Sequence, residues 1–163
     1  MTTKSNNLIY LDPLKKIRQI IRFAQRHSAA IERQCGVNGG QLWLMSELLD
    51  SPGLRVGELV KKLAAHQTTI SNLVDDLVEK GFVEKMSYEK DKRVTLLVLT
   101  ETGKKILENA PKPTRGVLPH ALSQIDEDVV KDLNDSLQKL INKMEGIDEE
   151  LGLHLLPYNL NEK

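Results

Sequence analysis

Cysteine is nearly absent from this sequence, since one of its 163 residues is a cysteine, Cys35. A single cysteine forms no intrachain disulfide and cannot build a zinc site from cysteines. Aromatic residues are also scarce, at 4% of the chain, so a core must be built mainly from Leu, Ile and Val. Such a core favours helices packed along aliphatic stripes over a β-sandwich, and we expect a mainly α-helical protein.

An excess of either charge is missing as well, because 23 Lys and Arg side chains balance 23 Asp and Glu side chains. Zero net charge excludes a protein that coats polyanions nonspecifically, although it allows a local basic patch. No apolar run approaches the roughly 20 residues of a membrane span, and residues 1–16 lack the features of a signal peptide. We therefore expect a cytoplasmic protein without a membrane partner.

Motifs of catalysis and metal binding are missing too. The chain has no glycine-rich phosphate loop, no G-x-S-x-G and no His–Glu zinc motif. Its four histidines lack metal-ligand spacing: His27, His66, His120 and His154. These absences predict a protein that is not an enzyme and holds no metal or cofactor.

Amphipathic helices are expected at both ends of the chain. The first begins at Asp12 and Pro13, which suit the N-cap and the first helical position, and runs to about Gln34, before Gly36. Its apolar or small residues recur with the three-and-four spacing of a coiled-coil seam: Leu14, Ile17, Ile21, Ala24, Ser28 and Ile31.

The last helix begins after Asp126 and is too long for a small domain alone to cover its apolar stripe, which consists of Val129, Val130, Leu133, Leu137, Leu140, Ile141 and Met144. Prolines at 111, 113 and 119 interrupt the helical pattern before it and predict either a kink or two helices joined by an extended piece. Residues 146–163 form a tail that is expected to be a short packed turn or a frayed end.

The centre of the chain, residues 38–100, changes from helical to strand periodicity. Asn38 and Gln41 form a capping box for "QLWLMSELLD", and "GELVKKLAA" predicts a short helix. In "TTISNLVDDLVEKG", residues 68–81, one apolar stripe predicts a further helix. The β-rich runs "FVEKMS" and "RVTLLVLT" then flank the polar "YEKDK", which predicts a hairpin. This order is typical of a winged helix-turn-helix.

Three motifs carry a family resemblance. "GELVKKL", "SNLVDDLVEKGFVEK" and "DKRVTLLVLTETG" resemble the third helix, the recognition helix and the wing signature of the MarR family of bacterial transcription regulators. The wing signature is the specific part, with Asp91, Arg93, Leu99, Thr100 and Gly103 in register. Together with the helical arms, the resemblance covers most of residues 12–145.

The resemblance implies a homodimer that binds a pseudo-palindromic double-stranded DNA operator, with residues 12–36 and 101–145 forming the dimerisation region. The residues expected to dimerise are Leu14, Ile17 and Ile21 in the first helix and Val130, Leu133, Leu137 and Leu140 in the last. In the family, the wing arginine reaches into the minor groove and the nearby aspartate orients it. These roles carry over to Arg93 and Asp91.

Further DNA contacts are expected from the polar start of the recognition helix, which comprises Gln67, Thr68, Thr69, Ser71 and Asn72, and from Lys90 and Lys92 in the wing. The alternative is an ordinary solvated surface. Eight basic and seven acidic side chains between residues 55 and 95 leave a net charge of plus one, so attraction to DNA must come from their placement.

The resemblance also implies a ligand-responsive repressor with a small aromatic or phenolic effector, because family members often bind small aromatic anions in a cavity between the arms and the centre. His27, Trp43 and Met45 are expected to line such a cavity or to belong to the core. Cys35 is expected to be buried and unreactive, because the oxidant-sensing cysteines of the family lie nearer the start of the first helix. The alternative function is a winged helix for protein contact, with Asp75, Asp76 and Glu79 facing a basic partner.

Overall fold

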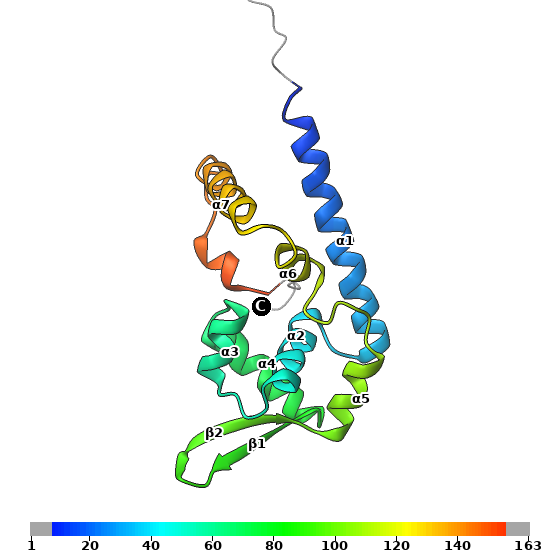
Figure 1. Cartoon of the computed structure of the whole chain (residues 1–163), viewed down its shortest axis with the longest axis vertical. Helices are drawn as coiled ribbons and strands as arrows, with labels where there is room; N and C mark the ends of the chain where they lie inside the picture. The colour runs from blue at the N-terminus through cyan, green and yellow to red at the C-terminus, as the bar shows by residue number, and fades with distance from the viewer. Residues whose placement is uncertain (1–7, 156–163) are drawn as a thin grey trace, which may run out of the picture.

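The computed structural model describes residues 8–155, which form helices around one antiparallel hairpin (Figure 1). The helices of this part are α1 (Leu11–Cys35), α2 (Gly39–Asp50), α3 (Val56–Leu63), α4 (Gln67–Glu79), α5 (Glu101–Asn109), α6 (Val117–Leu122), α7 (Glu127–Ile141) and the 3₁₀ helix η1 (Glu149–Leu153). The hairpin strands are β1 (Val83–Tyr88) and β2 (Asp91–Leu99). The expected mainly α-helical fold with a β-hairpin wing is confirmed.

The core lies in the winged-helix body, between α2, α3, α4 and the hairpin. Its largest fully buried side chains are Ile31, Val37, Leu42, Leu44, Met45, Leu48, Leu59, Leu63, Ile70, Val74, Leu77 and Leu97. These residues are aliphatic apart from Met45, as the scarcity of aromatics predicts. The predicted stripe of α4 is confirmed, because Ile70, Val74 and Leu77 face inward at helical spacing.

Local signals set the ends of several helices. The predicted capping box is present: the Asn38 side chain accepts from the Gln41 N–H at 2.8 Å, and the Gln41 side chain accepts from the Asn38 N–H at 2.9 Å. Gly36 ends α1 with φ of 67°, a left-handed conformation that glycine adopts without cost. Ala64 adopts the same region with φ of 49° at the turn between α3 and α4.

The proline-rich segment forms the second of the two predicted arrangements. Helix α5 ends at Asn109, residues 110–116 are extended or turn-like, and α6 begins at Val117. The Thr114 hydroxyl lies 3.0 Å from that of Ser46 on α2, and α6 packs against α1. The segment therefore joins the winged-helix body to the long N-terminal helix.

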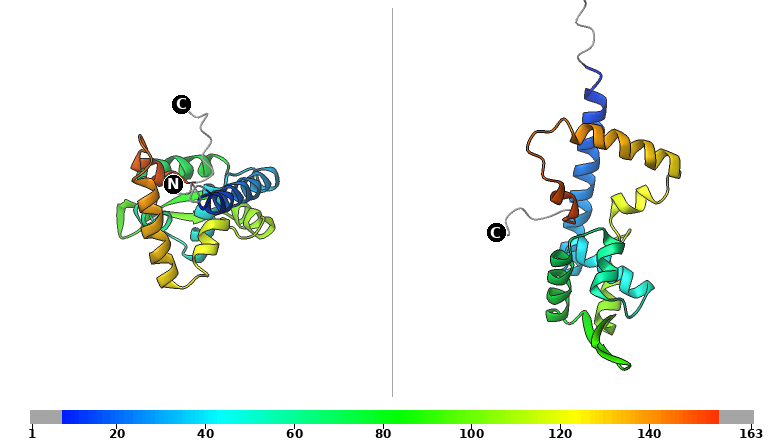
Figure 2. Two further views of the ribbon diagram at one scale, coloured as in Figure 1. Left: turned by 90° about the horizontal axis from the view of Figure 1, so that it is seen from above. Right: turned by 90° about the vertical axis from the view of Figure 1, so that its left-hand side faces the viewer.

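The arms extend away from this body. Figures 1 and 2 show the hairpin at one end of the molecule and the start of α1 at the other, with α7 away from the hairpin. No residue of α7 is buried, and Leu137 and Leu140 are 44% and 46% exposed. On α1, Leu14 and Ile17 are partly buried and Ile21 is 50% exposed.

After α7 the chain returns to the body through η1. The His66 N–H, immediately before α4, donates to the Leu153 carbonyl at 3.2 Å, and the Leu155 side chain packs near Gly40. The described part of the predicted tail is thus a packed turn, while residues 156–163 lie outside the described residues. Among residues 8–155, no helix is both long and apolar enough to cross a membrane.

Candidate nucleic-acid interface

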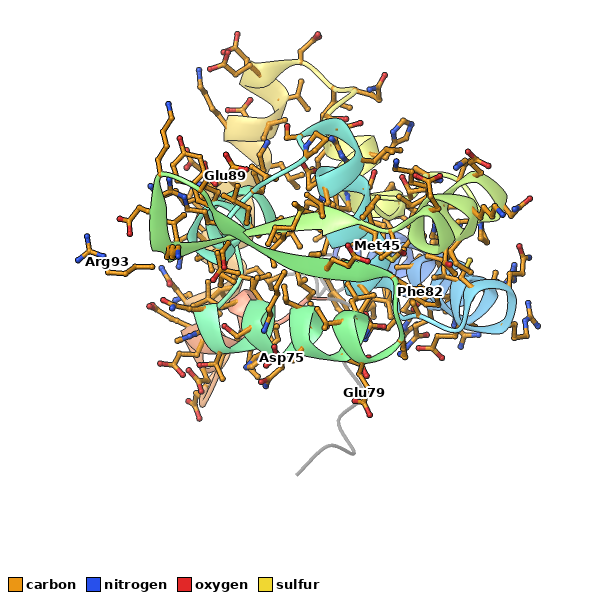
Figure 3. The ribbon with its side chains drawn as sticks, turned by 90° about the horizontal axis from the view of Figure 1, so that it is seen from below. Met45, Asp75, Glu79, Phe82, Glu89 and Arg93 are labelled. Carbon is orange, nitrogen blue, oxygen red and sulfur yellow. The ribbon has the colours of Figure 1, made fainter. Side chains whose placement is uncertain are left out.

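Helix α4 and the hairpin share the end of the molecule seen from below in Figure 3. The apolar stripe of α4 is turned into the body, so its opposite face is left for solvent. On that face Gln67, Thr68 and Asn72 are exposed, and Thr69 and Ser71 are partly buried at its margins. The structure therefore brings the five predicted recognition-helix residues together around the N-terminal half of α4, where the helix dipole favours phosphate.

The hairpin forms the wing beside α4. Its strands pair antiparallel from Val83 opposite Leu99 to Ser87 opposite Thr95, with an irregularity before the tip. The base is fixed to the body, because the Leu97 N–H donates to the Leu54 carbonyl at 2.9 Å. Lys90 and Lys92 lie exposed near the tip. The wing thus carries cations on an anchored, two-stranded support.

Arg93 is almost fully exposed, with 92% of its side chain open to solvent. Asp91 accepts from the Arg93 backbone N–H at 3.0 Å, from Nε at 3.1 Å and from Nη2 at 3.3 Å. These hydrogen bonds from Arg93 hold the pKa of the Asp91 carboxyl below its ordinary value. Because a guanidinium has five donors, the pair orients Arg93 and leaves N–H groups for a further acceptor. Figure 3 shows Arg93 pointing away from the body.

Two of the three acidic side chains of α4, Asp75 and Asp76, have partners of their own. Asp76 accepts hydrogen bonds from the buried Gln41 on α2 and from Lys80, whose Nζ lies at 2.8 Å. The bond from Lys80 and that from Gln41 hold the Asp76 pKa below 3.8. Asp75 pairs with Lys85 of β1 at 2.6 Å. Two of the acids that would repel phosphate thus help to fix α4 on the body.

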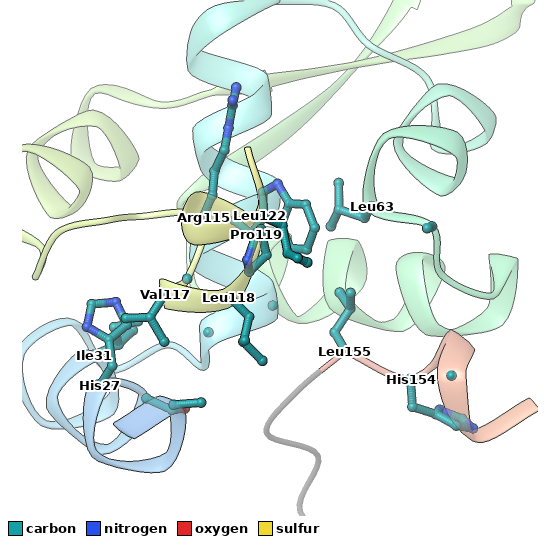
Figure 4. Close-up of a pocket in the computed structure, with 18 of the residues that line it drawn as sticks. His27, Ile31, Leu63, Arg115, Val117, Leu118, Pro119, Leu122, His154 and Leu155 are labelled. Atoms are coloured by element: carbon teal, nitrogen blue, oxygen red, sulfur yellow. The ribbon is translucent and has the colours of Figure 1, made fainter. Parts of the chain in front are cut away.

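A cavity of about 340 Å³ adjoins this unit, between α1, α2, α6 and residues 151–155 (Figure 4). His27 and Trp43 line it, as predicted. Met45 does not, because it is fully buried in the core on another side of α2. The prediction that Met45 lines a cavity is therefore wrong, and its alternative, a core residue, holds. The His27 Nε2 lies 3.0 Å from the Pro113 carbonyl, a contact that ties α1 to the proline-rich segment.

Glu47 is a functional candidate that sequence reasoning missed. Its carboxylate, 7% exposed, accepts from the Trp43 indole Nε1 at 3.0 Å and lies 2.9 Å from Arg115 Nε. Lys62 of α3 lies 3.5 Å away on the other oxygen. The signal was present in "QLWLMSELLD", since Glu47 stands one helical turn after Trp43 within an apolar helix. Glu47 connects the cavity wall to the helix-turn-helix.

Neither a metal site nor a reactive thiol stands out in this region. Within residues 8–155, no group of three His, Cys, Asp or Glu side chains is placed to hold a metal ion. Cys35 is buried as predicted, and burial raises the pKa of its thiol, which favours the protonated form.

Comparison with known proteins agrees with this geometry. The model of the MarR family matches residues 37–95. The HTH-type transcriptional regulator BilQ of Clostridium symbiosum (strain WAL-14163) is 32% identical over 105 residues, which span 64% of this chain and 73% of BilQ. The HTH-type transcriptional repressor YetL of Bacillus subtilis (strain 168) is 30% identical over 113 residues, spanning 68% of this chain and 63% of YetL.

Among solved structures, a complex of S. aureus MepR with DNA superimposes with a TM-score of 0.56 at 21% identity, covering 85% of this chain and 98% of that one. At this level of identity the likeness concerns the fold. Assignment to a family rests on the match to the MarR family model and on the identity shared with BilQ. The chain belongs to the MarR family of DNA-binding transcriptional regulators.

Proposed function

We propose that this regulator is a homodimeric repressor that docks two α4 helices and two wings on a pseudo-palindromic operator. It would lose operator affinity when a small molecule occupies the cavity. The single observation that carries the DNA-contact assignment is the Asp91–Arg93 pair, which presents a mostly free guanidinium on the same end of the molecule as the start of α4. This function has three parts, which are groove reading, dimerisation and response to a ligand.

Groove reading is assigned to the exposed, uncharged face of α4. Asn72 can pair with both hydrogen-bonding groups of adenine, and the Thr68 methyl can meet a thymine methyl. Gln67, Thr69 and Ser71 add polar contacts to phosphates or base edges. Arg93 reaches the minor groove, and Lys90 and Lys92 approach the backbone. With Asp75 and Asp76 already paired to Lys85 and Lys80, the repulsion of phosphate is reduced.

Dimerisation is assigned to the arms, in the region formed by residues 12–36 and 101–145, with residues 38–100 as the DNA-binding unit and residues 146–163 as a tail. The support is the apolar stripe of α7, which the described chain leaves uncovered. Its expected contacts are Val130, Leu133, Leu137 and Leu140, together with Leu14, Ile17 and Ile21 of α1. Contiguous apolar surface of this kind marks an interaction site, and a second copy offers the same stripe.

Response to a ligand is assigned to the cavity because it lies where the arms meet the winged helix. Trp43 and Arg115 belong to its wall, and both contact Glu47, which also pairs with Lys62 of α3. A ligand that moves either side chain would thus act on the helix-turn-helix. Two half-sites lie about 34–36 Å apart, so a shift of a few ångströms in one arm opposes simultaneous docking.

The test of this function is the Arg93→Ala variant on the DNA flanking the protein's own gene. We expect weaker binding and a shallower salt dependence, with the slope of log K falling by about 0.9 for each phosphate that is no longer neutralised, or roughly 2 for two wings. Lys16→Ala removes an exposed cation from α1, far from the hairpin, and serves as the control.

Each outcome has a definite meaning. If Arg93→Ala binds as tightly as the wild type at every salt concentration, the wing assignment is wrong. If the wild type shifts no DNA at any salt concentration, the alternative of a protein-contact module gains support instead.

A further inference from the structure

The described wall of the cavity beside Trp43 carries one permanent charge. Of the side chains within residues 8–155 that line it, three are titratable, namely His27, Arg115 and His154, and none is a carboxylate. The rest of the wall is mainly apolar, and Figure 4 shows Ile31, Leu63, Val117, Leu118, Leu122 and Leu155 around the space. The electrostatics of the cavity therefore depend on how Arg115 is engaged.

Arg115 is occupied by two carboxylates. Its Nε lies 2.9 Å from Glu47 and its Nη2 lies 2.7 Å from Asp50. In Figure 4 the side chain extends along α2, away from Leu118 and Leu155. With Lys62 at 3.5 Å from Glu47, the cluster holds two positive and two negative groups and has no net charge.

An anion that entered the cavity would therefore find no cation in this cluster without a carboxylate partner. Arg115 keeps N–H groups that face neither carboxylate, but an anion that reaches them meets a guanidinium already neutralised by Glu47 and Asp50. Both carboxylates would repel the anion at short range. A cation is not favoured either, because the described part of the wall holds no carboxylate, and an ion brought out of water without a partner loses its hydration.

A hydroxyl group on the described wall lacks a hydrogen-bond partner. Ser28 lines the cavity on α1 and is 3% exposed, and its hydroxyl has no hydrogen-bond partner within the described residues. A buried hydroxyl without a partner is unfavourable, so a ligand group that bonds to it is favoured. The volume of about 340 Å³ lies at the small end of the range of ligand pockets, about 300–1,000 Å³.

We propose that the cavity binds a small, uncharged, largely apolar molecule with one hydrogen-bonding group for Ser28, and that it discriminates against the anion of the same skeleton. The inference rests on the proposed effector role of the cavity and narrows the ligand class. It differs from the aromatic anions that the family resemblance implies, because here the cation on the wall is already neutralised.

Two probes of matched shape test the inference: 4-tert-butylbenzyl alcohol, which is neutral, and 4-tert-butylbenzoate, which is an anion at pH 7.5. Trp43 is the one tryptophan of the chain and lines the cavity, so its fluorescence reports occupancy directly. Calorimetric titration of the full-length protein gives the affinities. We expect the alcohol to bind at least about tenfold more tightly than the carboxylate, because only the anion must be buried without a counterion.

Two variants separate the causes. Asp50→Asn releases one partner of Arg115 at an exposed site and should tighten binding of the carboxylate while leaving that of the alcohol unchanged. Asp128→Asn, which changes a carboxylate on α7 that is 96% exposed, is its control and should change neither. Ser28→Ala should weaken binding of the alcohol by roughly two- to tenfold, which is the effect of losing one hydrogen bond.

The outcomes distinguish the two levels of the proposal. If the wild type binds the carboxylate as tightly as the alcohol or more tightly, the charge inference fails while the cavity remains a ligand site. If neither probe changes Trp43 fluorescence or releases heat, both the inference and the effector role fail. Operator binding by the same preparation shows whether the DNA-binding function stands apart from them.

Discussion

Gly103 lies where α5 begins, against the turn between α4 and β1, and its replacement by alanine tests the packing of this joint. Thr100 caps α5 by accepting from the Gly103 N–H at 3.0 Å, and its own hydroxyl donates to the Gly81 carbonyl at 2.8 Å. The Thr100 N–H also donates to the Phe82 carbonyl at 3.1 Å. The start of α5 is thus drawn onto the backbone of residues 81–82.

The missing side chain of Gly103 makes this approach feasible. A Cβ added there would lie 2.3 Å from the Phe82 carbonyl oxygen and 3.2 Å from the nearest Leu99 side-chain atom. Real Cβ contacts do not fall below 3.0 Å, so the backbone must separate by at least about 0.7 Å. The oxygen cannot simply turn aside, because Thr100 N–H holds it.

The expected cost follows from two opposing terms. Overpacking of this kind destabilises by about 1–3 kcal/mol, whereas alanine in place of glycine in a helix gains about 0.5–1 kcal/mol. The net loss of unfolding free energy is therefore between about 0 and 2.5 kcal/mol, centred near 1 kcal/mol, and a loss of about 1 kcal/mol lowers the melting temperature by roughly 2–4 °C for a chain of this size. Operator affinity should fall as well, because α5 leads from the wing toward the arms.

Urea denaturation measures the loss of unfolding free energy. The protein concentration is kept fixed, because dimerisation makes apparent stability depend on it. Gly57→Ala is the matched control, since Gly57 lies in α3, is exposed, and has no atom within 4 Å of an added Cβ. That variant should be neutral or slightly stabilised. If Gly103→Ala unfolds at the same urea midpoint as the wild type, the close approach of α5 to Phe82 does not exist as described.

Two further perturbations address the arms and α4. Leu137→Asp places a charge in the exposed apolar stripe of α7 and should convert dimer to monomer in sedimentation, whereas Lys139→Ala in the same helix should not; an unchanged dimer would place the interface elsewhere. Asp76→Asn removes a carboxylate whose folded pKa lies below 3.8. The contribution of this carboxylate to the free energy of unfolding is fully present above the ordinary pKa of 3.8. It is lost as the pH falls through the lowered pKa of the folded state. The difference in melting temperature between wild type and Asp76→Asn should therefore be constant from about pH 7 to 5 and shrink below about pH 4; a difference that grows in acid would contradict the pairing with Lys80 and Gln41. Since Asp76 is 45% exposed, the difference should be modest.

Most of the elements are encoded locally and were predictable from the sequence. The capping box of Asn38 and Gln41, the inward stripe of Ile70, Val74 and Leu77, and the change to strand periodicity after Gly81 all depend on residues within a few positions of one another. The same is true of the Asp91–Arg93 pair, whose members are two residues apart. Short-range geometry of this kind follows directly from helix and strand periods.

The cavity residues show where local reasoning ends. Trp43 and Met45 stand two positions apart on α2, so they point to different sides of the helix, yet nothing in their spacing tells which side faces the cavity. The structure places Trp43 at the cavity and Met45 in the core. Similarly, the proline-rich segment was compatible with either a kinked helix or two separate helices. The structure has two separate helices, and residues of the connecting segment contact α1 and α2.

The order of the helices and the wing, the family and the polar start of α4 can be inferred from the sequence alone, because periodicity and short motifs encode them. Which charged side chains pair with one another depends on the folded structure. Asp76 is paired with Gln41 of another helix, Asp75 with Lys85 of the wing, and Glu47 with Arg115 beyond α5. The two members of each pair are far apart in the sequence. The sign of a side chain's charge does not reveal which partner the fold will bring within 4 Å of it.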